Sequence, residues 1–217
     1  VLAGFGVGYS VQVANAVGAG DDARARRVTR QGALAAAVTG LLALAVMEAL
    51  AGVLPRWLGA EPEVYPLAVS YLRWYSLGLP FTAVLYIFSA ILRCMGNTKT
   101  PLFLNSLANI ANIVLNFFLI YPTRQWRGIT FYGAGLGVAG AAIASALSLA
   151  IAGLLLLRAV FFNKAKPVSV GPEENYRPDW AIIRAALGLG VPYIGERLTV
   201  NLGQILMTKL VAHVGTV

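Results

Sequence analysis

Long apolar runs separated by short charged connections constrain the fold of this chain more than any other feature. Charged residues make up only 12% of the sequence, whereas a soluble domain has roughly a quarter. Each complete run is long enough to cross the roughly 30 Å hydrocarbon core of a bilayer as a helix, and lipid offers an open strand no hydrogen-bond partner. The sequence therefore predicts an all-α membrane protein, a polytopic helical bundle in the lipid bilayer, with about six transmembrane helices over residues 1–17, 32–54, 67–92, 102–121, 135–162 and 185–212.

The connections between these runs differ in charge from one side of the predicted bundle to the other. Residues 18–31, 93–101 and 163–184 together hold ten Lys or Arg, whereas residues 55–66 and 122–134 hold three. Because cytoplasmic connections carry the excess of cations, we place the first set in the cytoplasm. The net charge of +8 then reflects the orientation of the protein in the membrane. No nucleic-acid partner is predicted, since the cations do not form a stripe on one soluble face.

The chain divides into two predicted bundles joined by a linker. Residues 163–184 combine three prolines with charges of both signs, a composition typical of an interdomain linker. We predict a first bundle over residues 1–162, a cytoplasmic linker over residues 163–184, and the first helix of a second bundle over residues 185–217. Because the sequence opens inside an apolar run and does not begin with Met, we expect it to be an internal piece of a longer chain.

Glycine and proline fall inside two of the apolar runs. Gly78 lies two residues before Pro80, and Gly190 lies two residues before Pro192. These pairs predict broken or bent helices, a feature found in transporters, where a bend can gate a cavity.

Three asparagines lie on one stripe of the predicted helix over residues 102–121. Asn109, Asn112 and Asn116 are spaced by three and four residues, so they share a helix face. An amide in hydrocarbon needs a polar partner, and the stripe must therefore face protein or a water-filled cavity. Two interpretations stay open, namely hydrogen bonds that hold a bundle together and a functional polar site. The same two apply to Ser145, which lies in a run of small residues that predicts close helix packing.

Catalytic signatures are missing from the sequence. One His and one Cys do not supply the ligands of a usual zinc site, and no nucleotide-binding or metalloprotease motif is present. We therefore predict no enzyme activity and no cofactor. Glu196 is a carboxylate within the last apolar run, and an ionisable group at such a position is a functional candidate.

Five segments, in this order, resemble the multidrug and toxic compound extrusion (MATE) transporter family. They are GAGDDARARR at 18–27, GAEPEVYPLAVSYL at 59–72, LRCMGNTKTP at 92–101, NIANIVLNFFLI at 109–120 and GVAGAAIASALS at 137–148. The resemblance implies a twelve-helix protein of two six-helix lobes. This chain would hold the second to sixth helices of the first lobe, the linker and the seventh helix, and the remaining half of the same chain would complete the transporter.

The resemblance also implies a function and a set of site residues. Members of the family export organic cations or drugs across the bacterial inner membrane in exchange for H⁺ or Na⁺, by alternating access. Asn112 and Asn116 match a polar pair on the fifth helix, and Ser145 matches a hydroxyl on the sixth. Some members carry Asp at the position of Asn116. Asn does not ionise, so a proton relay through this position is not expected, whereas an amide oxygen still ligates Na⁺ or orients a neighbouring carboxylate. The family's acid on the seventh helix lies further along than Glu196, and its role does not transfer.

Three alternatives compete with drug export. A lipid-linked oligosaccharide flippase of the same superfamily would line its cavity with several cations, and the spans of the first lobe hold almost none. A membrane-embedded lipid-modifying enzyme would need His, Asp or Glu clustered at one depth, whereas the spans hold only Glu48 and Glu196. A scaffold without transport activity is disfavoured by the asparagine stripe and the interrupted helices.

Overall fold

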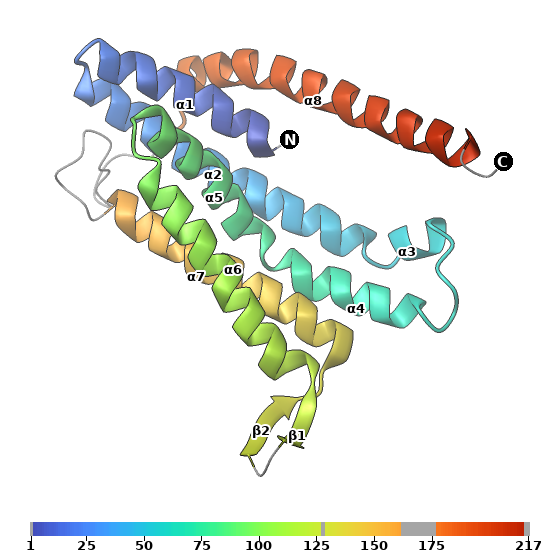
Figure 1. The fold of residues 1–217 in the computed structure, drawn as a ribbon. Coiled ribbons are helices and arrows are strands. Elements are labelled where there is room, and N and C mark those ends of the chain that lie inside the picture. Colours follow the sequence, from blue (N-terminus) through green and yellow to red (C-terminus); the bar gives the residue numbers. More distant parts are fainter. Residues whose placement is uncertain (1, 127–128, 162–176, 215–217) are drawn as a thin grey trace.

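In the part of the chain that the structure describes, seven long or medium helices form a bundle from which one short hairpin extends (Figure 1). The structure is a computed structural model that describes residues 2–126, 129–161 and 177–214. The elements are α1 (Leu2–Gly18), α2 (Asp22–Leu50), the single-turn α3 (Leu54–Trp57), α4 (Tyr65–Ser76), α5 (Leu79–Cys94), α6 (Lys99–Ile120), β1 (Pro122–Trp126), β2 (Ile129–Ala134), α7 (Gly137–Phe161) and α8 (Trp180–Val214). The chain runs up and down, so the α1–α2 and α5–α6 turns lie at one end of the bundle and α3 and the hairpin lie at the other (Figure 1).

Length and apolar composition confirm part of the predicted span pattern. Among the described residues, α2, α6 and α7 are long and apolar enough to cross a membrane, and α4 with α5 forms a fourth candidate, bent by 46°. The bend falls at the predicted position, because α4 ends at Ser76, Gly78 is the N-cap of α5, and Pro80 lies in the first turn of α5, where its missing N–H is not needed. The helices α1 and α8, also predicted as spans, do not meet this measure over the described residues.

The core lies around α5, which packs against α1, α2 and α7. Ile87, Phe88, Ile91 and Leu92 are fully buried there, and the ring of Phe88 meets that of Phe161 edge to face at 6.2 Å. The outer faces of α2 and α6 carry large exposed apolar side chains instead, among them Leu41, Leu42, Leu102, Phe103 and Ile113. In water such surfaces would mark interaction sites, and in a bilayer they are the surface that lipid covers.

The connection between α6 and α7 contains a hairpin that the sequence did not predict. β1 and β2 pair antiparallel, with Arg124 opposite Phe131 and Gln125 opposite Thr130, and a register irregularity lies between Pro122 and Arg124. The aromatic and β-branched residues of β2, in the segment ITFYGA, suit a strand. Tyr132 lies on this hairpin and is exposed.

Helix α8 begins inside the segment predicted as a linker. Residues 163–176 lie outside the described residues, but the chain is already helical at Trp180. The cause is a cap, since Asp179 Oδ1 accepts the backbone N–H of Ala181 at 3.0 Å. The helix then continues through Pro192, so the chain is not broken there.

The helices α1 and α8 pack side by side through small residues. A Cβ added to Gly8 would lie 2.2 Å from the carbonyl oxygen of Ala186, so only glycine permits this approach. Gln12, which is 9% exposed, donates from Nε2 to the carbonyl oxygen of Ile182 at 3.2 Å. The start of α8 is therefore tied to α1 by close packing and by a buried hydrogen bond.

Candidate functional site

A chain of hydrogen bonds joins α6 to α7 at the predicted polar site. Asn116 Nδ2 donates to Asn112 Oδ1 at 3.0 Å, and Asn112 Nδ2 donates to Ser145 Oγ at 3.1 Å. Ser145 Oγ in turn donates to the carbonyl oxygen of Ala141 at 3.0 Å. Because the hydroxyl has only one proton, Ser145 must accept from Asn112, and this fixes the direction of the whole chain.

Close contact between α6 and α7 brings these three side chains together. A Cβ on Gly140 would lie 2.5 Å from the carbonyl oxygen of Leu119, so this glycine permits the backbones to approach as the small-residue pattern predicts. Asn112 and Asn116 are one helical turn apart on α6, and Ser145 faces them from α7. The asparagine stripe of α6 and the small-residue run of α7 thus form one polar contact between the two helices.

One acceptor at the end of this chain has no partner. Asn116 Oδ1 is buried, and the described residues offer it no hydrogen bond. A buried amide oxygen without a hydrogen-bond partner lowers the stability of the fold by roughly 1–3 kcal/mol. The penalty is larger where lipid surrounds the group, because lipid offers no hydrogen bond. The oxygen is therefore placed to accept a hydrogen bond from a protonated group or to ligate a cation.

The other two candidate residues are not part of this cluster. Asn109 lies on the same stripe but is exposed. Glu196 lies on α8 and is also exposed, and its neighbour Arg197 donates from Nε to the hydroxyl of Tyr193 at 3.0 Å. The structure therefore brings together Asn112, Asn116 and Ser145, and leaves Asn109 and Glu196 apart from them.

Sequence reasoning missed a polar cavity between α5 and α6. The cavity has a volume of about 430 Å³, and the residues that line it include Thr82, Tyr86, Ser89, Arg93 and Asn105. Ser89 Oγ is buried without a described hydrogen-bond partner. Asn105 precedes Asn109 by four residues, so continuing the asparagine spacing by one turn would have found it.

Glu48, near the C-terminal end of α2, has partners within the bundle. Ser76 Oγ lies 2.5 Å from Glu48 Oε1 and 2.7 Å from the carbonyl oxygen of Arg73. Arg73 Nε lies 4.0 Å from Glu48 Oε2. Glu48 therefore ties α2 to the end of α4, next to the bend at Gly78.

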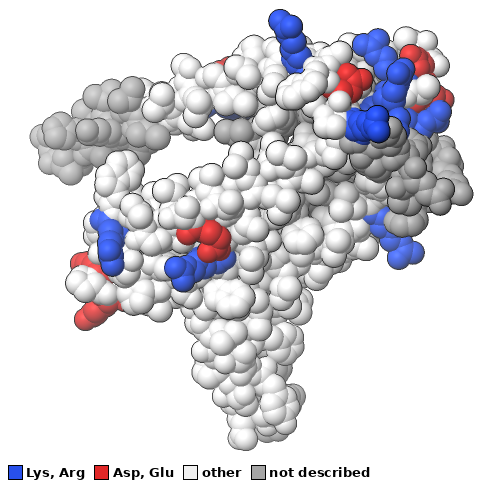
Figure 2. Space-filling model, turned by 180° about the vertical axis from the view of Figure 1, so that it is seen from behind, with Lys and Arg blue, Asp and Glu red and all other residues white. Residues whose placement is uncertain are grey.

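Charge is distributed unevenly between the two ends of the molecule. Figure 2 shows Lys and Arg gathered mostly at the end where α1 meets α2, and a smaller group of both signs at the opposite end. The first group includes Arg24, Arg26, Arg27 and Arg30, all in the first turns of α2. This agrees with the asymmetry counted in the sequence.

A bundle of apolar helices with a bent span and a polar cluster between two of them is the architecture of a multi-pass membrane protein. The chain belongs to the MatE family, because the family model MatE matches residues 1–118.

Named relatives and solved structures agree with this assignment. The chain is 27% identical over 218 residues to a probable multidrug resistance protein NorM of Thermotoga maritima, covering 99% of this chain and 44% of that protein. It is 24% identical to the multidrug export protein MepA of Staphylococcus aureus, covering 97% and 44%. Its fold matches a crystal structure of MATE in the bent conformation with a TM-score of 0.84 and 25% identity, covering 97% and 44%. The chain therefore spans less than half the length of the relatives it matches.

Proposed function

We propose that this chain forms most of the first lobe and the first helix of the second lobe of a secondary antiporter. The transporter exports organic cations or drugs across the bacterial inner membrane in exchange for H⁺ or Na⁺. Family membership and the names of the relatives support the transport class. The observation that carries the proposal is the hydrogen-bonded chain from Asn116 to Ser145, which ends in a buried acceptor without a partner.

The coupling ion interacts with this acceptor. Na⁺ is a hard cation that prefers oxygen ligands, and Asn116 Oδ1, Asn112 Oδ1 and Ser145 Oγ are three oxygens in one cluster. Asn112 and Ser145 already hold the amide of Asn116 in place, so its free oxygen is oriented before the ion arrives. The remaining ligands come from water or from the rest of the transporter.

Proton coupling requires a different group. An amide does not ionise, and neither α6 nor α7 carries an Asp or Glu. In a proton-coupled transporter, Asn116 Oδ1 accepts a hydrogen bond from a protonated carboxyl outside this chain. Either coupling ion thus uses a lone pair of the same oxygen, which ligates Na⁺ directly or accepts the hydrogen bond of a protonated carboxyl.

Alternating access follows if the ion binds one conformation more tightly than the other. An ion shifts the outward–inward equilibrium only by its differential affinity for the two states. The polar cluster lies between α6 and α7, whereas α8 begins beside α1 and its C-terminal part extends away from the other helices (Figure 1). Ion binding in the first lobe would then change the affinity for the drug by shifting the position of one lobe relative to the other.

The test compares two asparagine variants of the full-length transporter in everted membrane vesicles. Asn116→Ala removes the buried oxygen and should abolish gradient-driven drug efflux. Asn109→Ala removes an exposed amide on the same helix and should leave most of the efflux intact. Matched protein levels and unchanged thermal stability confirm that both variants fold. Equal efflux by Asn116→Ala and Asn109→Ala would contradict a role for the cluster.

A further inference from the structure

A polar stripe on α5 borders the cavity between α5 and α6. Its residues, Thr82, Tyr86, Ser89 and Arg93, are spaced by four, three and four positions, so they share one helix face, and all four line the cavity of about 430 Å³. We propose that this cavity binds the transported compound, and that Arg93 gives the transporter a preference for aromatic compounds that carry a carboxylate. The inference rests on the proposed export function and narrows its substrate class.

Ser89 provides a hydrogen-bond donor that no described residue uses. The residue is 3% exposed, and its Oγ has no hydrogen-bond partner in the described part of the chain. A hydroxyl within a helix often donates to the carbonyl oxygen one turn earlier, as Thr82 Oγ1 does to that of Gly78 at 3.1 Å, but Ser89 Oγ does not. Because Ser89 lines the cavity, its hydroxyl is placed to donate to an oxygen of a bound compound, in exchange for a water molecule.

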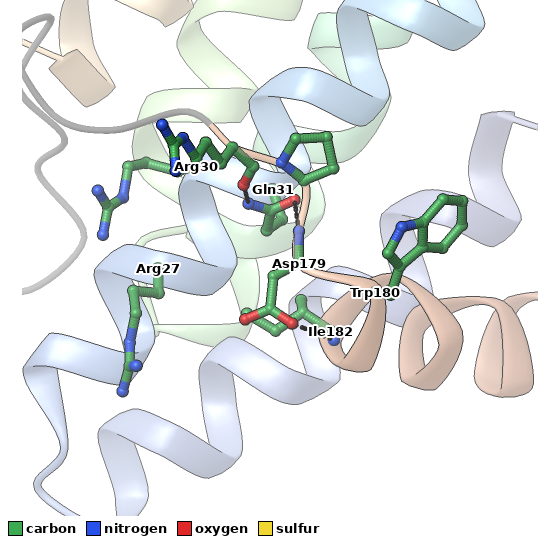
Figure 3. Close-up of a pocket in the computed structure, with 8 residues that line it drawn as sticks. Arg27, Arg30, Gln31, Asp179, Trp180 and Ile182 are labelled. Atoms are coloured by element: carbon green, nitrogen blue, oxygen red, sulfur yellow. Dashed lines mark hydrogen bonds between the residues drawn. The ribbon is translucent and has the colours of Figure 1, made fainter.

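The charge of the cavity favours a carboxylate. Among the described residues that line it, Arg93 is the one charged side chain, and no described residue forms an ion pair with it. The cavity at the start of α8 differs (Figure 3), because Arg30 and Arg177 there have interaction partners and Asp179 contributes a negative charge. The guanidinium of Arg93 can bind a carboxylate through two parallel N–H groups, whereas it repels a compound that carries only positive charge.

An aromatic and apolar wall faces the polar stripe. Its residues are Tyr75, Leu85, Tyr86 and Leu149. The ring of Tyr75 is stacked on that of Tyr71, with centroids 5.8 Å apart, and aromatic rings of a ligand pair favourably with such faces. A volume of this size is typical of sites for drug-sized compounds. A compound aligned with the stripe would place its carboxylate at Arg93, an oxygen near Ser89 and its rings beside the tyrosines.

The cavity is separate from the polar cluster of α6 and α7. Asn105 lines the cavity from α6 and precedes Asn112 by seven residues, which is about 10 Å along the helix. Both asparagines lie on one face of α6. The transported compound and the coupling ion therefore occupy different positions along the same helix, and their binding can be tested separately.

The experiment measures dye binding to the full-length transporter in detergent by fluorescence anisotropy. The probes are a rhodamine with a free carboxylate, the acid dye, and the methyl ester of the same rhodamine, the ester dye. The variants are Arg93→Gln, which removes the charge, Arg93→Lys, which keeps the charge but not the paired N–H groups, and Ser89→Ala. The control is Lys99→Gln, which removes a cation at the start of α6 that does not line the cavity.

We expect the wild-type protein to bind the acid dye more tightly than the ester dye. Arg93→Gln should weaken binding of the acid dye by about tenfold, the lower end for a charge-assisted hydrogen bond because Arg93 is exposed, and should cause no loss for the ester dye. Arg93→Lys should retain part of the preference, and Ser89→Ala should weaken binding of both dyes by about 2- to 12-fold. Equal wild-type affinity for the two dyes, an equal loss for both in Arg93→Gln, or the same loss in Lys99→Gln would overturn the proposal.

Efflux of the same dyes in everted vesicles separates this inference from the proposed function. Binding that depends on Arg93, without gradient-driven efflux of either dye, would support the carboxylate site and contradict drug export. Efflux with an unchanged ratio of the two dyes in Arg93→Gln would support drug export and overturn the preference. Displacement of the acid dye by short-chain phosphatidylglycerol would assign Arg93 to a lipid headgroup and would overturn the proposal as well.

Discussion

Asn112 on α6 donates a hydrogen bond from Nδ2 to Ser145 Oγ on α7 at 3.1 Å. These residues are 33 positions apart in the sequence, and their contact joins the two helices at the depth of the polar cluster. Since Ser145 gives its proton to the carbonyl oxygen of Ala141, the contact orients Asn112 and, through it, Asn116. The unpartnered oxygen of Asn116 is therefore held by a residue on the neighbouring helix.

Replacing Ser145 by Ala should weaken ion-coupled transport without unfolding the protein. The change removes the acceptor for Asn112 Nδ2, and one hydrogen bond of this kind contributes about 0.5–1.5 kcal/mol. The apparent affinity for the coupling ion should fall by about 2- to 12-fold, by the same conversion. The measurement is the ion concentration that gives half-maximal efflux. Ser106→Ala, an exposed serine on α6, serves as the control, and an equal shift in that variant would argue against a specific role for Ser145.

Two glycine-to-alanine changes should have opposite effects on thermal stability. At Gly140, a Cβ would lie 2.5 Å from the carbonyl oxygen of Leu119, so α6 and α7 would have to separate; at Gly195 a Cβ would meet nothing within 4 Å. Gly140→Ala should destabilise the protein by about 1–3 kcal/mol. Gly195→Ala should be neutral or stabilise it by up to about 1 kcal/mol, because alanine is the better helix former. Melting curves of the two variants in the same detergent test this, and a stable Gly140→Ala variant would contradict the close α6–α7 contact.

The partners of Glu48 should contribute unequally to stability. Ser76 is buried and lies 2.5 Å from Glu48 Oε1, whereas the Arg73 contact is 4.0 Å long between side chains that are 63% and 40% exposed. A hydrogen bond to a charged group contributes more than an exposed ion pair. We expect Ser76→Ala to cost about 1–2 kcal/mol and Arg73→Gln to cost less than about 1 kcal/mol. Denaturation of both variants shows which substitution lowers the free energy of unfolding more. A larger loss for Arg73→Gln than for Ser76→Ala would contradict this expectation.

The cavity beside Ser89 and Asn105 should contain water. Its lining is polar in an otherwise apolar bundle, and a buried hydroxyl such as Ser89 Oγ needs a partner. In a background with Cys94→Ser, which removes the one thiol of this sequence, Asn105→Cys should react with a membrane-impermeant thiol reagent. Ile113→Cys, on the exposed apolar face of α6, should stay unlabelled in a bilayer. The reverse pattern would mean that lipid, and not water, reaches Asn105.

Much of the architecture followed from the sequence, because hydrocarbon leaves the backbone few alternatives. The apolar runs predicted helices close to their observed positions, the Gly78–Pro80 pair predicted the bend, and three- and four-residue spacing placed Asn112 and Asn116 on one face. The family resemblance named Ser145 as a site residue, but its hydrogen bond to Asn112 was not predicted, since spacing within one helix says nothing about the neighbouring helix.

Other features depended on contacts distant in the sequence. The start of α8 at Trp180 depends on the Asp179 cap and on Gln31, which lies 148 positions away from Asp179. The hairpin of β1 and β2 depends on pairing between two short segments that carry no strong turn signal. Glu196 was a candidate because of its place in an apolar run, but that run does not determine which side of α8 is covered, and the residue is exposed.

The most direct test of the account is drug efflux by the full-length transporter in everted vesicles, with Na⁺ and H⁺ gradients imposed separately. A fluorescent organic cation reports movement, and Asn116→Asp is compared with the wild-type protein. We predict that a Na⁺ gradient alone drives efflux in the wild type, because the oxygens of Asn112, Asn116 and Ser145 bind a cation without ionising, and that Asn116→Asp gains a response to the H⁺ gradient. Efflux driven only by H⁺ in the wild type would assign coupling to a carboxyl outside this cluster. No efflux under either gradient would contradict the central claim that this chain is part of a drug antiporter.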